Sequence, residues 1–188
     1  MIDVVAAALR GGIRAVQLRE RGLSARELLA LAAELRTVTR AAGAALLIND
    51  RIDVALAVAA DGVHLPSYSF SVTQARALLG RARLIGVSTH HPDEVSAAAA
   101  AGADFAVFGP VFDTPAKRVF GRAQGLTALV RARAAASVPL FAIGGIDVAS
   151  VAAVRRTGAD GVAVIRAVLA AAEPAAAAAA LVRAAEEG

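Results

Sequence analysis

Arginine and amide side chains gather where the first strongly apolar run of the sequence ends. In the segment 17–21, Gln17, Arg19 and Arg21 share one side of an extended chain, because side chains alternate along a strand. Two guanidinium groups on one side can bind an anion through charge-assisted hydrogen bonds. The alternative is a solvated strand end. Polar residues in buried strands are uncommon, so the pattern favours an anion site.

The next apolar run ends in Asn49 and Asp50. Asn49, the only asparagine of the chain, can hold a ring nitrogen or an amine through its amide. Asp50 offers the hard oxygen ligands that Mg²⁺ prefers, or it caps the helix that follows. The metal site is thus predicted from a single carboxylate.

Histidines follow the next two runs. His64 closes one of them, and Ser88 is followed by His90 and His91. Adjacent histidines point apart, so their spacing does not predict a metal site. With its near-neutral pKa, His90 either lines the site or belongs to a solvated loop.

Later connections carry phosphate-binding signals. The segment 109–124 is the longest connection and holds Lys117, the sole lysine. It is either a lid that carries Lys117 or an excursion without a role. The pairs Gly144-Gly145 and Ile165-Arg166 follow the last two apolar runs. In α/β barrels these two turns commonly bind phosphate through backbone N–H groups, and glycine permits close approach.

The elements that must position these residues repeat along the chain. An Ala-Asp turn closes a helical stretch and opens an apolar run at Asp61, Asp104 and Asp160. Short apolar runs of this kind predict buried parallel strands over Ile13–Arg19, Ala45–Asn49, Gly62–Leu65, Leu84–Ser88, Phe105–Gly109, Pro139–Ile143 and Gly161–Ile165. Helices are predicted over Asp3–Leu9, Ser24–Ala42, Arg51–Ala59, Val72–Leu79, Pro92–Ala101, Gly125–Ala135, Val148–Arg156 and Ala175–Glu187, with Ser24 and Glu27 as a capping box.

This alternation predicts an α/β fold with a parallel sheet inside a layer of helices. The number of repeats favours a (βα)8 TIM barrel spanning 1–188 as one domain, with an open doubly wound sheet as the alternative. Seven strands are predicted, and the helix at Asp3–Leu9 has no strand before it, so the barrel lacks its usual first strand. The polar residues above then meet at the carboxyl ends of the strands, where barrel enzymes have their sites.

Composition excludes several classes of protein. The 188 residues are 57% hydrophobic with a mean hydropathy of +0.60, which excludes intrinsic disorder. The net charge of +4 comes from scattered arginines, and aromatics are 4% without tryptophan, so no nucleic-acid partner is expected. There is no cysteine, no apolar run long enough for a membrane span and no basic segment behind Met1, and we expect a cytoplasmic protein.

Taken together, the segments 16–20, 47–51, 60–65, 86–90, 108–112 and 142–146 resemble the thiamine phosphate synthase superfamily over essentially the whole chain. The resemblance implies a barrel, a homodimer and a small-molecule phosphate substrate. The synthase joins a hydroxymethylpyrimidine diphosphate to a thiazole phosphate with Mg²⁺. The diphosphate leaves first, and the thiazole nitrogen attacks the resulting pyrimidine cation.

The resemblance also implies roles for individual residues. Gln17, Arg19 and Asn49 match contacts to the pyrimidine and the diphosphate, and Asp50 matches one Mg²⁺ ligand. The remaining matches are diphosphate, lid and phosphate-cradle positions, namely Ser88, Lys117, Thr114, Gly144 and Ile165.

Several positions depart from the synthase pattern. Ser69 stands where a second acidic Mg²⁺ ligand is expected, Arg21 replaces a lysine, Ala116 a threonine and Arg166 a serine. The stretches 19–24, 65–71 and 121–122 resemble the thiazole tautomerase branch instead, which aromatises a thiazole carboxylate phosphate without metal. Pro110 stands where that branch has its acid/base histidine, so His90 or His64 would have to replace it.

The primary hypothesis is therefore a thiazole tautomerase with Arg19, Lys117 and His90 as catalytic residues. The alternative is a Mg²⁺-dependent thiamine phosphate synthase. A non-catalytic binder of a phosphate metabolite and another phosphate-binding barrel are further alternatives, because a fold alone does not determine function.

Overall fold

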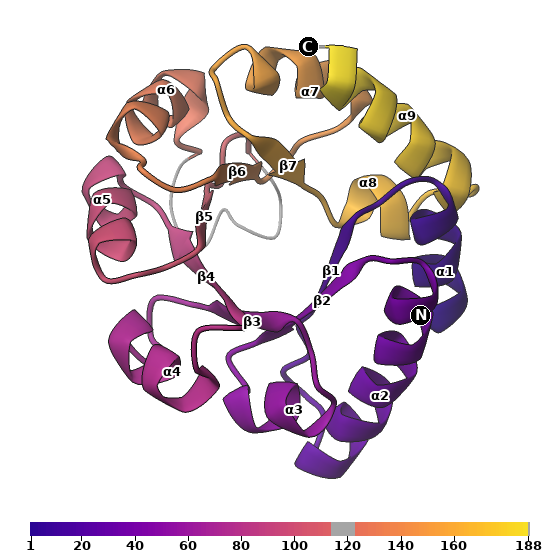
Figure 1. Ribbon diagram of the computed structural model, residues 1–188. Helices are drawn as coiled ribbons and strands as arrows, with labels where there is room; N and C mark the ends of the chain where they lie inside the picture. Colours follow the sequence, from indigo (N-terminus) through magenta and orange to yellow (C-terminus); the bar gives the residue numbers. More distant parts are fainter. Residues whose placement is uncertain (114–122, 188) are drawn as a thin grey trace.

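A parallel sheet forms the centre of the computed structural model, which describes residues 1–113 and 123–187 (Figure 1). Its seven strands are β1 (Ala15–Leu18), β2 (Ala45–Asn49), β3 (Gly62–Leu65), β4 (Leu84–Thr89), β5 (Phe105–Phe108), β6 (Leu140–Ile143) and β7 (Gly161–Ala163). They lie side by side in chain order and every neighbouring pair is parallel. All seven carboxyl ends therefore lie at one edge of the sheet.

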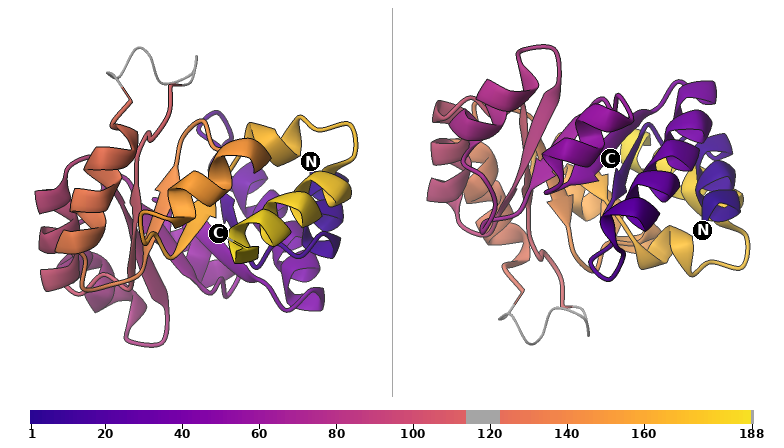
Figure 2. Two further views of the ribbon diagram at one scale, coloured as in Figure 1. Left: turned by 90° about the horizontal axis from the view of Figure 1, so that it is seen from above. Right: turned by 90° about the horizontal axis from the view of Figure 1, so that it is seen from below.

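Helices surround the sheet on the outside (Figures 1 and 2). They are α1 (Ile2–Arg10), α2 (Ala25–Ala41), α3 (Ile52–Ala57), α4 (Val72–Leu79), α5 (Pro92–Ala100), α6 (Gly125–Ala135), α7 (Val148–Arg155), α8 (Arg166–Leu169) and α9 (Pro174–Glu187). The first and last of them, α1 and α9, pack against each other (Figure 1). Within the described ranges, none of these helices is long and apolar enough to cross a membrane.

The strand order identifies the architecture as a curled, barrel-like α/β fold. A doubly wound sheet reverses its strand order at a switch point, whereas this order runs from β1 to β7 without reversal. The prediction of a barrel with seven strands is confirmed. Among the described residues, no ladder of hydrogen bonds joins β7 to β1, so the sheet keeps two edges.

The element boundaries either agree with the predicted ones, as for β2, β3, α4 and α6, or differ by one or two residues. The differences of two residues are at the start of β1, at the end of α3 and at the end of β7, which stops at Ala163. The four-residue helix α8 was not predicted, because so short a helix has no detectable periodicity. The capping box at Ser24 is confirmed: the Ser24 hydroxyl accepts from the N–H of Glu27, and the Glu27 carboxylate accepts from the N–H of Ser24.

Side chains from the outer face of the sheet pack with the helices in two apolar clusters. One includes Leu18, Ile48 and Val63 together with residues of α1 to α4, and the other includes Phe108 and Leu140. The alternate residues of the strands face the interior of the barrel, as the period of two requires. Polar side chains at those interior positions are therefore the candidates for a site.

The Ala-Asp turns of the sequence have one structural explanation. Each aspartate directly precedes a strand, accepts an N–H of the strand before it in the chain, and pairs with an arginine from the helix that leads into that earlier strand. The three sets are Asp61 with Leu46 and Arg36, Asp104 with Ile85 and Arg76, and Asp160 with Leu140 and Arg133. The repeat thus fixes the amino ends of alternate strands and leaves the carboxyl ends free for other residues.

Candidate functional site

Aromatic rings fill the interior of the barrel beside the candidate site. The ring of Phe105 lies 6.0 Å from that of His64 and 5.7 Å from that of Phe141 between centroids. Glycines make room for these rings: a Cβ on Gly86 would overlap the Phe105 ring, and one on Gly161 would lie 2.8 Å from the Phe141 ring. The β5 and β6 side of the interior is thus apolar and packed.

The side of the interior formed by β1 to β4 is polar. The amide of Gln17 on β1 donates to Asn49 Oδ1 on β2 over 3.1 Å. On the next two strands, His64 Nε2 lies 2.8 Å from Ser88 Oγ. Four neighbouring strands thus present two hydrogen-bonded pairs at adjoining positions, which brings three of the predicted binding residues together.

The Gln17–Asn49 pair leaves complementary groups free. Because Asn49 accepts through its oxygen, its NH₂ group remains a donor, while the oxygen of Gln17 remains an acceptor. An aminopyrimidine presents the matching set, an acceptor ring nitrogen beside a donor amine. The pair can therefore recognise such a ring edge on.

Asp50 is held in an unusual backbone conformation at the end of β2. Its φ is +67°, a region that aspartate tolerates better than most residues, and its N–H donates to the carbonyl of His64 over 2.9 Å. Its carboxylate accepts a short hydrogen bond from the hydroxyl of Ser69. Asp50 does not cap α3, whose first flanking residue is Arg51 without a side-chain cap, so the capping alternative is wrong.

Asp50 and Ser69 are the side chains that would have to hold a magnesium ion. The two positions assigned to metal ligands by resemblance are adjacent, but only one is a carboxylate. Mg²⁺ is commonly held by one or two carboxylates plus substrate phosphates, so Asp50 and Ser69 fit the ion when a diphosphate supplies further oxygens. No group of three or more acidic, histidine or cysteine side chains that could hold a metal occurs within residues 1–113 and 123–187.

The two arginines predicted to bind an anion, Arg19 and Arg21, lie in different surroundings. Arg21 donates to the hydroxyl of Tyr68 over 2.6 Å and lies over its ring, 5.5 Å from the centroid. Arg19 is exposed and lies close enough to His64 to affect its titration. Because β1 ends at Leu18, the alternation of a strand does not determine where Arg21 points.

His64 is the most deeply buried polar residue of the site, with 3% of its surface exposed. Burial and, to a smaller extent, the positive charge of Arg19 lower the pKa of its imidazole from the ordinary 6.5 to about 4. The ring is therefore neutral at pH 7 and a poor proton donor. From the sequence, His64 is predicted only as a replacement for the acid/base histidine of the tautomerase branch, and its place as the single polar residue of a buried strand was the signal for a role within the barrel.

The predicted catalytic residue His90 is held by the neighbouring loop. Its Nδ1 lies 2.6 Å from the carbonyl oxygen of Gly109, and its backbone N–H donates to Glu94 over 2.6 Å. A carbonyl accepts, so Nδ1 carries the proton and Nε2 is the atom left for chemistry. The adjacent His91 flanks the start of α5, which gives that residue a structural place.

The glycine pair at the end of β6 packs closely on the loop that follows β5. Gly144 and Gly145 have φ of +104° and +68°, and a Cβ on Gly144 would lie 2.6 Å from the Cα of Pro110. The N–H of Phe112 donates to the carbonyl of Gly144 over 2.9 Å. Replacing Gly144 would therefore disturb this packing as well as any bound phosphate.

Other predicted residues lie at the same edge or outside the described part of the chain. Ile165 and Arg166 are both exposed at the start of α8, directly after β7. Thr114 and Lys117 lie outside the described residues. Since all strands are parallel, Arg19, Gly144 and Ile165 follow the carboxyl ends of their strands on one side of the barrel.

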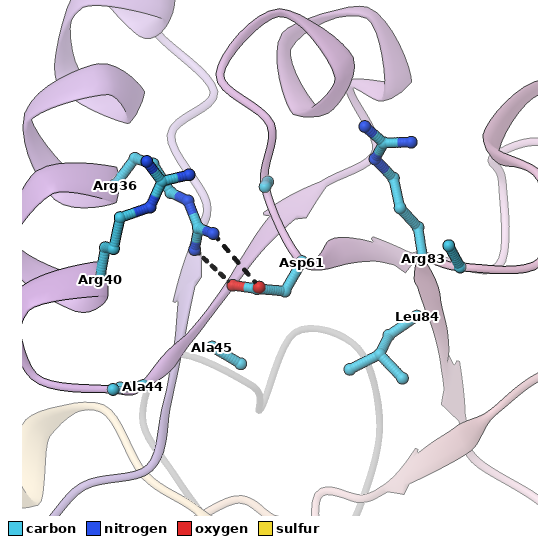
Figure 3. Close-up of a pocket in the computed structure, with 10 residues that line it drawn as sticks. Arg36, Arg40, Ala44, Ala45, Asp61, Arg83 and Leu84 are labelled. Carbon is cyan, nitrogen blue, oxygen red and sulfur yellow. Dashed lines mark hydrogen bonds and ion pairs between the residues drawn. The ribbon is translucent and has the colours of Figure 1, made fainter.

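A cavity of about 680 Å³ lies at the opposite, amino-terminal edge (Figure 3). It is lined by Arg36, Arg40, Asp61 and Arg83, with Arg36 and Asp61 joined as an ion pair at 2.6 Å. The same arginine–aspartate arrangement occurs at two other strand pairs, so the pair is a structural repeat. We therefore place the candidate site at the carboxyl ends of the strands rather than in this cavity.

The comparisons with known proteins agree with one another. The family model described as thiamine monophosphate synthase matches residues 1–168. The thiamine-phosphate synthase of Roseiflexus castenholzii is 46% identical over 181 residues, which are 96% of this chain and 79% of that protein. The one from Moorella thermoacetica is 46% identical over 177 residues, covering 94% and 84%. The solved thiamine phosphate pyrophosphorylase of Pyrococcus furiosus is 35% identical with a TM-score of 0.93, covering 99% and 89%.

Proposed function

Because this chain belongs to the thiamine monophosphate synthase family, we propose that it joins a hydroxymethylpyrimidine diphosphate to a thiazole phosphate and releases pyrophosphate. The observation that carries the proposal is the polar row of β1 to β4, which consists of the Gln17–Asn49 pair, the neighbouring His64–Ser88 pair and the Asp50–Ser69 pair after β2. Of the two activities considered, the relatives' names favour the synthase over the tautomerase.

Each part of the row has a proposed role. Gln17 and Asn49 hold the pyrimidine edge through their free acceptor and donor. Arg19 and the Ser88 hydroxyl contact the diphosphate, where their hydrogen bonds stabilise the charge that develops on the leaving group. Arg21, held by Tyr68, adds positive charge at the rim.

Asp50 and Ser69 would hold a magnesium ion together with diphosphate oxygens. When bound, the ion neutralises charge on the leaving diphosphate. The bond between the pyrimidine methylene carbon and the diphosphate oxygen breaks with its electron pair on oxygen, and the thiazole nitrogen then donates its lone pair to that carbon.

The thiazole phosphate is proposed to lie at the carboxyl ends of β6 and β7, across the barrel from the polar row. Gly144, Gly145, Ile165 and Arg166 follow β6 and β7, and backbone N–H groups at such turns suit phosphate. This places the nucleophile opposite the polar row. A homodimer is expected from the family resemblance, and sedimentation of the purified chain would test it.

The test is product formation by the purified chain. With both substrates and Mg²⁺ we expect thiamine phosphate and pyrophosphate in equal amounts, and neither product when one substrate is omitted. Absence of product from folded protein would refute the synthase. Aromatisation of the thiazole tautomer in the same preparation would instead support the tautomerase, for which Nε2 of His90, rather than the neutral His64, is the candidate acid/base.

A further inference from the structure

His64 carries a buried nitrogen that the proposed mechanism does not use. Its Nε2 lies 2.8 Å from Ser88 Oγ, while its Nδ1 has no hydrogen-bond partner among the described residues. Only 3% of the surface of His64 is exposed. A buried polar atom without a partner costs free energy and calls for an explanation.

The direction of the His64–Ser88 hydrogen bond follows from the groups available. A neutral imidazole carries one proton, on either Nε2 or Nδ1. A protonated Nδ1 would leave an N–H group buried without an acceptor, which is rarer in proteins than a buried acceptor without a donor. The lack of an acceptor at Nδ1 therefore places the proton on Nε2.

We propose that His64 is a positioning residue, which donates its Nε2–H to Ser88 Oγ and so directs the Ser88 hydroxyl proton toward an oxygen of the bound diphosphate. A serine has only one proton to donate. With its oxygen already accepting from His64, that proton is available to the anion rather than to the protein. The proposal rests on the proposed synthase function for the identity of the anion.

The role of His64 involves no net proton transfer. The leaving diphosphate takes the electron pair of the broken carbon–oxygen bond, and Ser88 stabilises that charge through a hydrogen bond that is stronger to the leaving group than to the substrate. The imidazole stays neutral throughout. Its contribution is the fixed orientation of one hydroxyl group.

The first test is independent of catalysis. Nitrogen-15 spectra of histidine side chains in the substrate-free protein distinguish a protonated Nε2 from a protonated Nδ1. We expect the protonated Nε2 form for His64. A protonated Nδ1 would overturn the proposal, even in a protein with full activity.

The second test compares two amide replacements of the same ring. The amide nitrogen of glutamine reaches roughly the place of Nε2, whereas that of asparagine is closer to Nδ1. We therefore expect His64→Gln to keep kcat within a few-fold of wild type, and His64→Asn to lower it roughly 10–100-fold, the size of loss seen when a residue that orients a metal ligand is replaced. The KM for the thiazole phosphate should change in neither variant.

A double variant separates positioning from a general packing effect. Ser88→Ala should lower kcat about as much as His64→Asn, and the two changes together should lower it no further, because they remove one shared interaction. Equal losses in the Gln and Asn variants, or additive losses in the double variant, would overturn the proposal. If wild-type protein forms no product, the proposed function is refuted. The nitrogen-15 spectrum of His64 still decides the direction of the hydrogen bond to Ser88 in that case.

Discussion

Arg19 is the residue whose removal best separates binding from folding. Its side chain is exposed, and no hydrogen bond or ion pair of its guanidinium is seen among the described residues. We expect Arg19→Ala to change the free energy of unfolding by less than about 0.5 kcal/mol, as for other exposed substitutions. Loss of a charged hydrogen bond to phosphate should raise the KM for the pyrimidine diphosphate by roughly ten- to a hundredfold, or ~1.5–3 kcal/mol. Arg26→Ala on α2 is the matched control, and equal losses of binding and stability in Arg19→Ala would show a structural role.

Ser69 allows the magnesium site to be tested by adding a carboxylate. Ser69→Asp would place a second acidic side chain beside Asp50, because the present hydroxyl already contacts that carboxylate. We expect the Mg²⁺ concentration for half-maximal rate to fall roughly tenfold, or ~1.4 kcal/mol. In chelator, the variant should melt at a lower temperature than wild type, since two unpaired carboxylates repel. Ser67→Asp, in the same loop and exposed, should do neither; an unchanged Mg²⁺ requirement in Ser69→Asp would argue against this ion site.

The buried imidazole of His64 predicts a pH dependence of stability. Its folded-state pKa of about 4 lies below the ordinary 6.5 of an unfolded chain, so the unfolded state binds more protons between these values. This contribution is fully present above pH 6.5 and is lost as pH falls toward 4, by roughly 3 kcal/mol. Denaturant titrations from pH 4 to 8 should show a steeper loss for wild type than for His64→Gln. Parallel curves would mean that His64 titrates normally.

At the scale of the element, the aspartates that open alternate strands are expected to matter for stability. Asp104→Ala would leave the N–H of Ile85 and the guanidinium of Arg76 without their present partner. An unpaired buried N–H costs about 1–3 kcal/mol. Asp104→Asn should lose less, because its amide oxygen can still accept from Ile85. Asp53→Ala is the control, since the exposed pair of Asp53 with Arg51 should contribute below about 1 kcal/mol. If urea denaturation shows similar losses in the free energy of unfolding for Asp53→Ala and Asp104→Ala, the aspartates before the strands have no special role in stability.

Most of the elements could be predicted from the sequence because each one carries a local signal. The Ala-Asp turn marks the start of β3, β5 and β7, and the capping box of Ser24 and Glu27 marks the start of α2. Where the signal is absent the prediction was less accurate, as at α8 and at the ends of β1. The end of β1 matters most, because Arg21 lies beyond it and turns to Tyr68 instead of following the strand.

The position of the site could also be predicted, since parallel strands bring their carboxyl ends together whatever the details of the loops. The particular pairings could not. The contacts of Asp50 with Ser69 and of Arg21 with Tyr68 join loops that are distant in sequence, and no local pattern specifies them. The importance of His64 became visible only when its burial and its bond to Ser88 were known.

At the scale of the whole molecule, the sheet is curled but keeps two edges. On β1, Ala15 and Gln17 are exposed, although the equivalent interior positions of β3 are buried. A strand in a parallel sheet alternates its hydrogen bonds between its two neighbours, so a strand with one neighbour leaves alternate N–H groups without a ladder partner. This asymmetry distinguishes β1 and β7 from the five strands between them.

Hydrogen exchange should report these edges directly. Local opening costs least where backbone groups lack partners and side chains are exposed, so alternate amides of β1 and β7 should exchange faster than those of β3 to β5 by orders of magnitude. Exchange followed by nuclear magnetic resonance would resolve individual amides, with β4 as the internal reference. Equal protection in all seven strands would mean that another segment or another chain covers the edges. Repeating the measurement after dilution separates these cases, because protection by a second copy falls with protein concentration and protection within one chain does not.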